Sequence, residues 1–300
     1  MRRTSPDLCS SPWAAPSQPT FRADIRGALR HVSHAGALAV SVGMAKTHCK
    51  IETGSEDNWL VGELKRAERY CENMVPGGFQ IMPATFDLPV SRWWRMLTLP
   101  RKPLQSVTSV KYFDVNNAEQ TAATTYYNVF AADLRQPGTV ELAPGQTWPD
   151  VEDERDYPIT VRFIAGCLAP VTAVAATNVL TSTGRAFHDN DLVRFWNSGG
   201  VGAALPTPLK AETDYYVRDA SGATFKVTDV PGGTAIDVTD AGTGLHYAGR
   251  IPEEITGAIL MLVEYWYRFR GAAVSGGAPK QIEFGVRELL ESAVGGGAYR

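Results

Sequence analysis

A short cluster in the middle of the chain, His188, Asp189 and Asp191, has the residue types that chemistry most often needs. An imidazole beside carboxylates could transfer protons or hold a metal ion, as in a hydrolase. Such an enzyme also needs a nucleophile, a base and a group that orients the base, and the sequence contains no identifiable set of this kind. Because Asp and Asn favour turns, the HDND run is more typical of a turn before a strand. We therefore predict that the protein is not an enzyme.

The other residues with chemical potential are scattered. His246 is isolated beside Tyr247, and His31 and His34 lack a third ligand for a metal ion. The four cysteines show no CxxC spacing, so neither a zinc site nor a disulfide framework is predicted. Phosphate loops, dinucleotide-binding fingerprints, nucleophile elbows and HExxH motifs are also missing from the sequence. We expect no catalytic residues, no cofactor and no metal ion.

Two further clusters and the overall charge favour a structural role. Trp93 and Trp94, flanked by arginines, could stack on bases or sugars, but this pattern is more typical of a packed interface or an amphipathic edge. The acidic loop from Asp150 to Asp156 lacks the spacing and the glycine of a calcium loop, so we interpret it as solvated. A net charge of −3 offers no basic field for reading DNA sequence.

The element that must organise the chain is a long helix near its end, Ile251 to Gly271. Pro252 suits the first helical position, and carboxylates at the start and arginines at the end match the helix dipole. About 19 residues could just cross a bilayer, but the internal Glu264 and the charged ends favour a water-soluble bundle, so no membrane association is expected. An apolar stripe at spacings of four and three forms the predicted core-facing side: Ile255, Ile259, Leu262, Trp266 and Phe269.

A pair of shorter helices is predicted upstream. Ser41 can cap a helix through Cys49, and Ser55 can cap a second helix that Pro76-Gly77-Gly78 ends. The second helix has an apolar stripe of Leu60, Leu64, Ala67, Cys71 and Met74. Cys71 falls within this stripe, so burial is expected rather than nucleophilic chemistry.

From Phe79 to Gly166 the apolar period changes to two, which indicates short strands, with a hairpin turn at Asn116-Asn117. The predicted strands are Gln80–Leu88, Val107–Asp114, Thr125–Phe130, Thr139–Leu142 and Ile159–Ile164. Residues 171–249 then interrupt the pattern as a small all-β module looped out of a surface turn. Its predicted strands are Leu192–Trp196, Asp214–Arg218, Thr224–Thr228 and Ala235–Val238.

Both ends of the chain are predicted to be loosely attached. The proline-rich residues 1–37 indicate a flexible arm with excess arginine, which could touch an acidic partner or nucleic acid. After a glycine-rich hinge, Gln281 to Leu290 suggests an extended piece that leads into a brief helix. This piece could add a strand to a partner's sheet, or it could pack back on its own domain, and the sequence leaves both possibilities open.

Five stretches resemble, in order, the head-to-tail connector (adaptor) proteins of long-tailed bacteriophages, prophages and gene transfer agents. They are AKTHCKIETGSEDNWLVGELKRAERYCENMV from Ala45, LTLPRKPLQSVTSVKYFD from Leu97, PGTVELAPGQTWP from Pro137, ITVRFIAG from Ile159 and IPEEITGAILMLVEYWYRFRGA from Ile251. The second stretch is the most specific. The module from Val171 to Gly249 and the proline-rich arm depart from the family pattern.

The resemblance implies an α+β fold, with a helical connector core, a short-stranded antiparallel β part and an inserted all-β domain. The implied division is an arm at 1–37, a connector core at 38–170 and 250–280, the inserted domain at 171–249 and a tail at 281–300. Subunits made in the host cytoplasm would form a ring of about twelve identical copies in the neck of the virion, between the portal and a stopper or tail-completion protein. The long helix would help to wall a channel through which double-stranded DNA passes without sequence-specific binding. The tail would engage the portal through Gln281, Ile282, Glu283, Phe284, Val286 and Leu289.

A second hypothesis concerns the inserted module, which looks like small β domains of phage tail and fibre proteins. In that case the chain would be a binding protein of a phage particle. Its β module would recognise a glycan or a host surface, and the helical part would serve as a mount.

Overall fold

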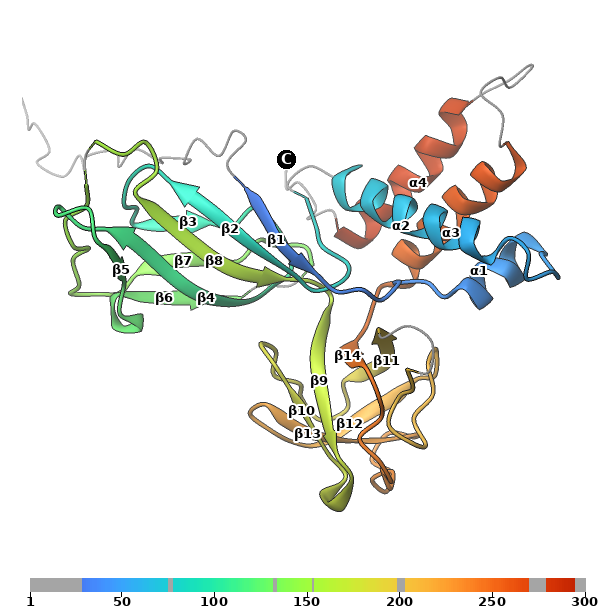
Figure 1. Ribbon diagram of the computed structural model, residues 1–300. Helices are drawn as coiled ribbons and strands as arrows, with labels where there is room; N and C mark the ends of the chain where they lie inside the picture. Colours follow the sequence, from blue (N-terminus) through green and yellow to red (C-terminus); the bar gives the residue numbers. More distant parts are fainter. Residues whose placement is uncertain are drawn as a thin grey trace, which may run out of the picture.

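The computed structural model describes residues 29–74, 78–131, 134–152, 154–198, 203–269 and 279–294, with the side chains of the last helix described from Gly285 onward. The chain has an α+β architecture in three parts: a layer of helices, a pair of antiparallel sheets and a closed β-barrel (Figure 1). The helices lie beyond one end of the sheets, and the barrel is attached at the region where the helices meet the sheets.

The helical layer consists of α1 (Val42–Cys49), α2 (Asp57–Met74), α3 (Glu253–Arg268) and α4 (Pro279–Val294). Ser41 caps α1, as predicted, because its hydroxyl accepts a hydrogen bond from the Met44 amide at 3.0 Å. The prediction that Ser55 caps α2 is wrong. That helix begins at Asp57, and the Ser55 hydroxyl lies 3.1 Å from the hydroxyl of Thr53.

The predicted stripe of α2 is confirmed at Leu60, Leu64, Ala67 and Cys71, which are all fully buried. The two amphipathic helices α2 and α3 pack on each other, and α4 packs on α3. Together their apolar faces form the core of the helical layer.

The first sheet has the strand order β1-β2-β8-β4-β5, and the second has the order β3-β7-β6. All pairings are antiparallel, and the Asn116-Asn117 turn joins β4 to β5 as predicted. The two sheets share one core, to which Phe86, Phe163 and Val140 belong. The strands are β1 (Arg30–His34), β2 (Ala84–Val90), β3 (Met96–Thr98), β4 (Leu104–Phe113), β5 (Glu119–Thr121), β6 (Tyr127–Phe130), β7 (Thr139–Leu142) and β8 (Ile159–Ala165).

The barrel closes in the order β10-β13-β12-β11-β14-β9, because β10 also pairs with β9. It has its own core, which is dominated by Phe187, Phe195, Tyr215 and Phe225. Its strands are β9 (Leu168–Val174), β10 (Val179–Ser182), β11 (Leu192–Ser198), β12 (Tyr215–Ser221), β13 (Thr224–Thr228) and β14 (Leu245–Gly249).

Three strand expectations need correction. The predicted strand at Ala235–Val238 is not a strand, although the Ile236 amide still bonds to the Val227 carbonyl at 2.8 Å. Strands β3, β5, β9, β10 and β14 were not predicted. Strand β9 begins at Leu168, before the expected module boundary, and it continues through Pro170, which sequence reasoning takes as the end of a strand.

The flexible arm predicted at residues 1–37 extends too far along the chain, because its last residues are structured. Arg30–His34 form β1, which pairs with β2, and Ala35 and Ala37 are buried just after it. All five residues of β1 are exposed, so this edge strand has no alternating pattern that could reveal it. The rest of the expected arm, residues 1–28, lies outside the described residues.

The extended piece expected before the brief helix of the tail is wrong, because residues 279–294 form one continuous helix, α4. Val286, Leu290 and Val294 recur at a spacing of four, are fully buried and belong to the core that α4 shares with α3. The described part of the tail therefore packs back on its own chain. The expected glycine-rich hinge from 271 lies almost entirely outside the described residues.

Candidate functional site: the junction of the three parts

Four chain segments cross between the helices, the sheets and the barrel at one place, which we call the junction. They are residues 35–40, 79–82, 166–168 and 249–251, and their buried side chains join the core of the helical layer. Two glycines permit the close crossings. A Cβ at Gly166 would lie 2.8 Å from the Pro83 Cα, and one at Gly249 would lie 2.8 Å from the Cys167 carbonyl oxygen.

Glu72 on α2 holds the segment that leads into the first sheet. Its Oε1 accepts hydrogen bonds from the Gln80 side-chain amide at 2.7 Å and from the Ile81 backbone amide at 2.9 Å. The carboxyl group is 7% exposed, and burial raises its pKa to about 7 even though the Ile81 amide and Arg101 act in the opposite direction.

Glu68, one turn earlier on α2, holds the segment that leaves β1. Its Oε1 accepts a hydrogen bond from the Ala39 amide at 2.6 Å. Burial raises the pKa of this carboxyl to about 8, partly offset by that hydrogen bond, and the nearby charge of Glu72 raises it further. The two carboxyls thus satisfy backbone amides of crossing segments that have no regular secondary structure.

Basic and amide side chains from the loop before β4 and from β4 itself complete the junction. Arg101 donates to the Glu72 and Phe79 carbonyls at 3.2 and 3.3 Å and to the Asn73 side chain at 2.9 Å. Buried Lys102 donates to the carbonyl of Val294 at 3.0 Å, which stabilises the C-terminal end of α4. Gln105 donates to the Gly166 carbonyl at 2.9 Å. One cluster of polar contacts therefore joins the helices to the start of the barrel.

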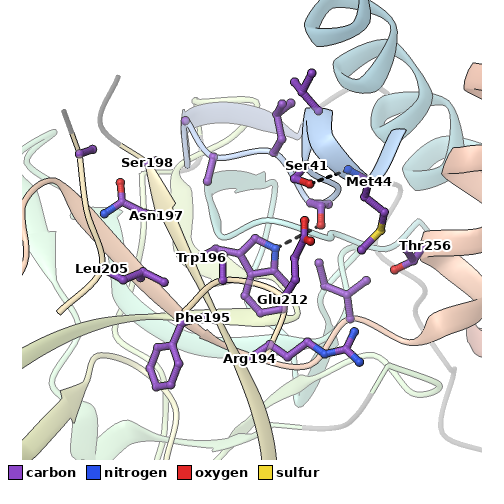
Figure 2. Close-up of a pocket in the computed structure, with 18 of the residues that line it drawn as sticks. Ser41, Met44, Arg194, Phe195, Trp196, Asn197, Ser198, Leu205, Glu212 and Thr256 are labelled. Atoms are coloured by element: carbon purple, nitrogen blue, oxygen red, sulfur yellow. Dashed lines mark hydrogen bonds between the residues drawn. The ribbon is translucent and has the colours of Figure 1, made fainter. Parts of the chain in front are cut away.

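The barrel contacts the helical layer through the outer face of β11. The Trp196 indole donates to the Ala39 carbonyl at 3.1 Å, and Arg194 pairs with Glu253 of α3 at 3.0 Å. Between these contacts lies a cavity of about 570 Å³ (Figure 2). Trp196 and Glu212 lie beside it, whereas the Phe195 side chain extends away into the barrel. The barrel lines one side of the cavity, and α1 with the segment before it lines the other.

The predicted core residues of the long helix are only partly buried. Ile255, Ile259 and Leu262 are in the core, as expected from the stripe. Trp266 is half-buried beneath Arg66, whose guanidinium carbon lies 4.1 Å from the ring centroid. Phe269 is 46% exposed because α3 ends at Arg268, so its placement in the core is wrong.

The predicted portal-binding residues fall in α4. Val286 is fully buried against α3, and Leu289 is half-buried in the same core, so neither is free for a partner while α4 stays packed. The side chains of Gln281, Ile282, Glu283 and Phe284 lie outside the described residues.

The residues with chemical potential have structural roles. The Asp191 carboxylate accepts from the His188 amide at 2.9 Å, and Asp189 accepts from the Ala220 amide at 2.8 Å, which is the predicted turn. The His246 ring lies 3.0 Å from the Asn197 side chain. Within the described ranges, no three His, Cys, Asp or Glu residues are grouped as a metal ion would require. None of the described helices combines the length and the apolarity that a bilayer span requires.

The tryptophan cluster is a packed interface, as predicted. Trp93 and Trp148 stack at 4.2 Å between ring centroids. The indoles of Trp93, Trp94 and Trp148 donate to backbone carbonyls at 2.6 to 3.0 Å. These side chains join the two sheets, and their polar atoms are already used.

Sequence reasoning missed the junction carboxyls. Glu68 and Glu72 flank Cys71 on the buried side of α2, and Leu64 precedes Glu68 by one turn. Two acidic residues four apart within an apolar stripe were the available signal. Their partners are 29 and 9 residues away and belong to segments without periodicity, so the partners could not be identified from the pattern.

Comparison with known proteins gives matches only among solved structures. No protein-family model matches the chain, and no curated protein matches it. The chain is similar to a chain in the neck of an empty gene transfer agent particle computed with C6 symmetry (18% identity, 88% of this chain and 93% of that chain, TM-score 0.49). It is also similar to a chain in the virion of a native gene transfer agent particle (18% identity, 88% of this chain and 94% of that chain, TM-score 0.49). A chain in the neck of a native particle computed with C12 symmetry gives 15% identity, coverage of 88% and 93%, and a TM-score of 0.45.

Proposed function

We propose that this chain is a structural virion protein, one subunit of a head-to-tail connector ring in the neck of a phage-like particle. The ring would lie between the portal and a stopper or tail-completion protein and would surround the DNA channel. A ring of about twelve copies follows from the family that the sequence resembles.

The observation that carries the proposal is where the five resembling stretches lie. They lie in α1 and α2, β3 and β4, β7, β8, and α3, so each of them contributes to the helical layer or to one of the two sheets. The non-matching segment forms a separately closed barrel, whose two ends leave the junction paired at Leu168 and Gly249. The connector-like part is therefore continuous in space although it is interrupted in sequence.

The charge of the chain suits this role. DNA must slide through a connector, and each phosphate that the wall neutralises adds affinity and therefore friction. A net charge of −3 over the whole chain favours weak contact with the duplex.

Deletion of the gene from a strain that makes such particles tests the proposal. We expect DNA-filled heads and separate tails, because the joint between them is missing. Re-expression of the chain should restore joined particles that show a closed ring at the neck by electron microscopy. Normal joined particles without the chain would contradict the proposal.

Excision of the barrel tests the binding hypothesis for the module. Replacing residues 170–247 by Asn-Gly would join Ala169 to Ala248, which already face each other across β9 and β14, through a two-residue hairpin turn. Under the connector proposal, particles with the excised chain still join heads to tails. If joining persists and only attachment to the host is lost, the barrel is the module that binds a glycan or host surface.

A further inference from the structure

A groove of about 460 Å³ lies between the edge strand β1 and helix α2, on one side of the junction. Its floor includes the buried Glu68 and Glu72. The remaining titratable residues that line it are all basic: His31 and His34 from β1, Lys65 and Arg69 from α2, and Arg101 from the loop before β4.

The groove is positively charged near neutral pH. The side chains of Lys65 and Arg69 are exposed and make no hydrogen bond or ion pair with any described residue. Arg101 is fixed by its bonds to two carbonyls and Asn73. The floor carboxyls already accept backbone amides, and burial favours their neutral form. Burial lowers the pKa of His34, a hydrogen bond with Ala35 acts in the opposite direction, and the nearby charges of His31, Arg69 and Lys65 lower the pKa further. Such a groove favours an anionic ligand.

A matching anionic segment lies at the other end of the same molecule, in the loop that precedes β8. The loop contains five acidic residues, Asp150, Glu152, Asp153, Glu154 and Asp156, against one basic residue, Arg155. Asp150, Glu154 and Asp156 are exposed, and their carboxylates make no hydrogen bond or ion pair within the part of the chain that the structure describes. Their charge is therefore available to a partner.

The loop cannot reach the groove of its own chain. Strand β8 runs from the loop to the junction over seven residues, which is about 20 Å at ~3.3 Å per residue. Figure 1 shows the start of β8 at the end of the sheet that is remote from the helices, whereas β1 ends close to the junction. Contact between the two charged regions requires two copies of the chain.

We propose that the basic groove of one copy receives the acidic loop of a second copy. The contact is heterologous, since different faces of the two subunits meet, and repetition of such a contact around an axis closes a ring. The inference rests on the proposed connector function, and it names the surfaces that would join neighbouring subunits.

Charge reversal on each side tests the contact. The variant K65E/R69E changes two exposed side chains without partners, and E154K/D156K does the same in the loop. Each variant should keep its secondary structure and weaken subunit association at least about tenfold, as measured by sedimentation of the purified chain and by the occupancy of rings at particle necks. The combined four-residue variant should restore rings, because the charges are complementary again.

A matched control is K50E/K210E, which makes the same change in net charge at exposed positions outside the groove and the junction and should leave association unchanged. Rings that persist in both groove and loop variants, or a combined variant that stays unassembled, would overturn the inference while leaving the connector function intact. Loss of duplex DNA affinity in K65E/R69E with normal rings would also overturn it, in favour of a phosphate-binding groove. Failure of the unmodified chain to form rings, even in particles, would instead remove the proposed function.

Discussion

The barrel and the helical layer bury apolar residues in different ways. Every buried residue of the barrel core comes from a single stretch, residues 169–248, and the six strands close on themselves. The core of the helical layer draws on residues 35–82, 167–168, 247–263 and 286–294. The barrel is therefore a self-contained unit, whereas the helical layer exists only when distant segments meet at the junction.

The polar groups differ in the same way. The junction buries two carboxyls and the ammonium group of Lys102, whereas the buried polar residues of the barrel are neutral hydroxyl groups and His246. Because a buried charged or titratable group costs more than a buried hydroxyl, the junction should be the part of the molecule that responds to pH. Four experiments can break or sharpen this comparison.

The largest expected effect is that of Phe225→Ala in the barrel. Phe225 is 1% exposed and packs against Phe187 at 4.8 Å between ring centroids. Its truncation should destabilise the barrel by about 3–5 kcal/mol. Hydrogen exchange should show faster opening of β9 to β14 with unchanged protection in α2 and α3. Equal loss of protection in the helices would show that the barrel is not self-contained.

Leu64→Ala should cost about 2–5 kcal/mol, because Leu64 is fully buried at the centre of the α2 stripe. Here the effect should spread. Faster exchange is expected in α2, α3 and the crossing segments 35–40 and 79–82, which pack on the same core. Loss of protection that stays within α2 would contradict the idea that the helical layer and the junction are one cooperative unit.

This difference also determines what the sequence could predict. The stripes of α2 and α3, the strand β7 and the strand β13 repeat apolar residues at a regular period, so local pattern sufficed. Strand β1 depends on backbone pairing along an exposed edge, and its side chains carry no signal. Helix α4 follows a glycine-rich stretch, and the alternation of Ile282 and Phe284 favoured an extended form that packing on α3 overrides. The junction could not be predicted from sequence pattern, because contacts such as that of Glu68 with Ala39 join residues far apart in sequence.

The pH dependence of stability should arise from the junction. The folded carboxyls of Glu68 and Glu72 have pKa values of about 8 and about 7, above the ordinary value of 4.5 expected in the unfolded chain. Between these pH values the folded state therefore binds more protons than the unfolded state. As a result, the free energy of unfolding should fall as pH rises from about 4.5 to about 8. Below that range the stabilisation is fully present.

Glu68→Gln and Glu72→Gln should each flatten this dependence while keeping a carbonyl acceptor for the backbone amide. Glu72→Ala should flatten the dependence as well, and below about pH 4.5 it should cost about 1–3 kcal/mol, because the Ile81 amide loses its acceptor. This cost should shrink as pH rises, because the variant has no buried carboxyl to ionise. Urea unfolding at several pH values, followed by a probe in the helices, measures both effects. As a control, Glu254→Gln at an exposed position of α3 should leave the pH slope unchanged. A barrel transition with the same slope as the helical layer would contradict the assignment of pH sensitivity to the junction.

The smallest effects should come from the rim of the helical layer, where α3 ends. Trp266 is half-buried against α2, with Arg66 over its ring and Tyr70 at 6.2 Å edge-on. Trp266→Ala should therefore cost about 1–2 kcal/mol, less than the ~3–5 kcal/mol of a fully buried tryptophan, because part of the ring already faces solvent. Phe269→Ala, at a 46% exposed side chain beyond the helix end, should stay within about 0.5 kcal/mol. Chemical unfolding of the two variants beside Ile259→Ala, which lies at the centre of the same helix face, would rank rim against core. A cost for Trp266→Ala as large as that for Ile259→Ala would mean that the core of the helical layer extends to the end of α3, and that its boundary with solvent lies elsewhere.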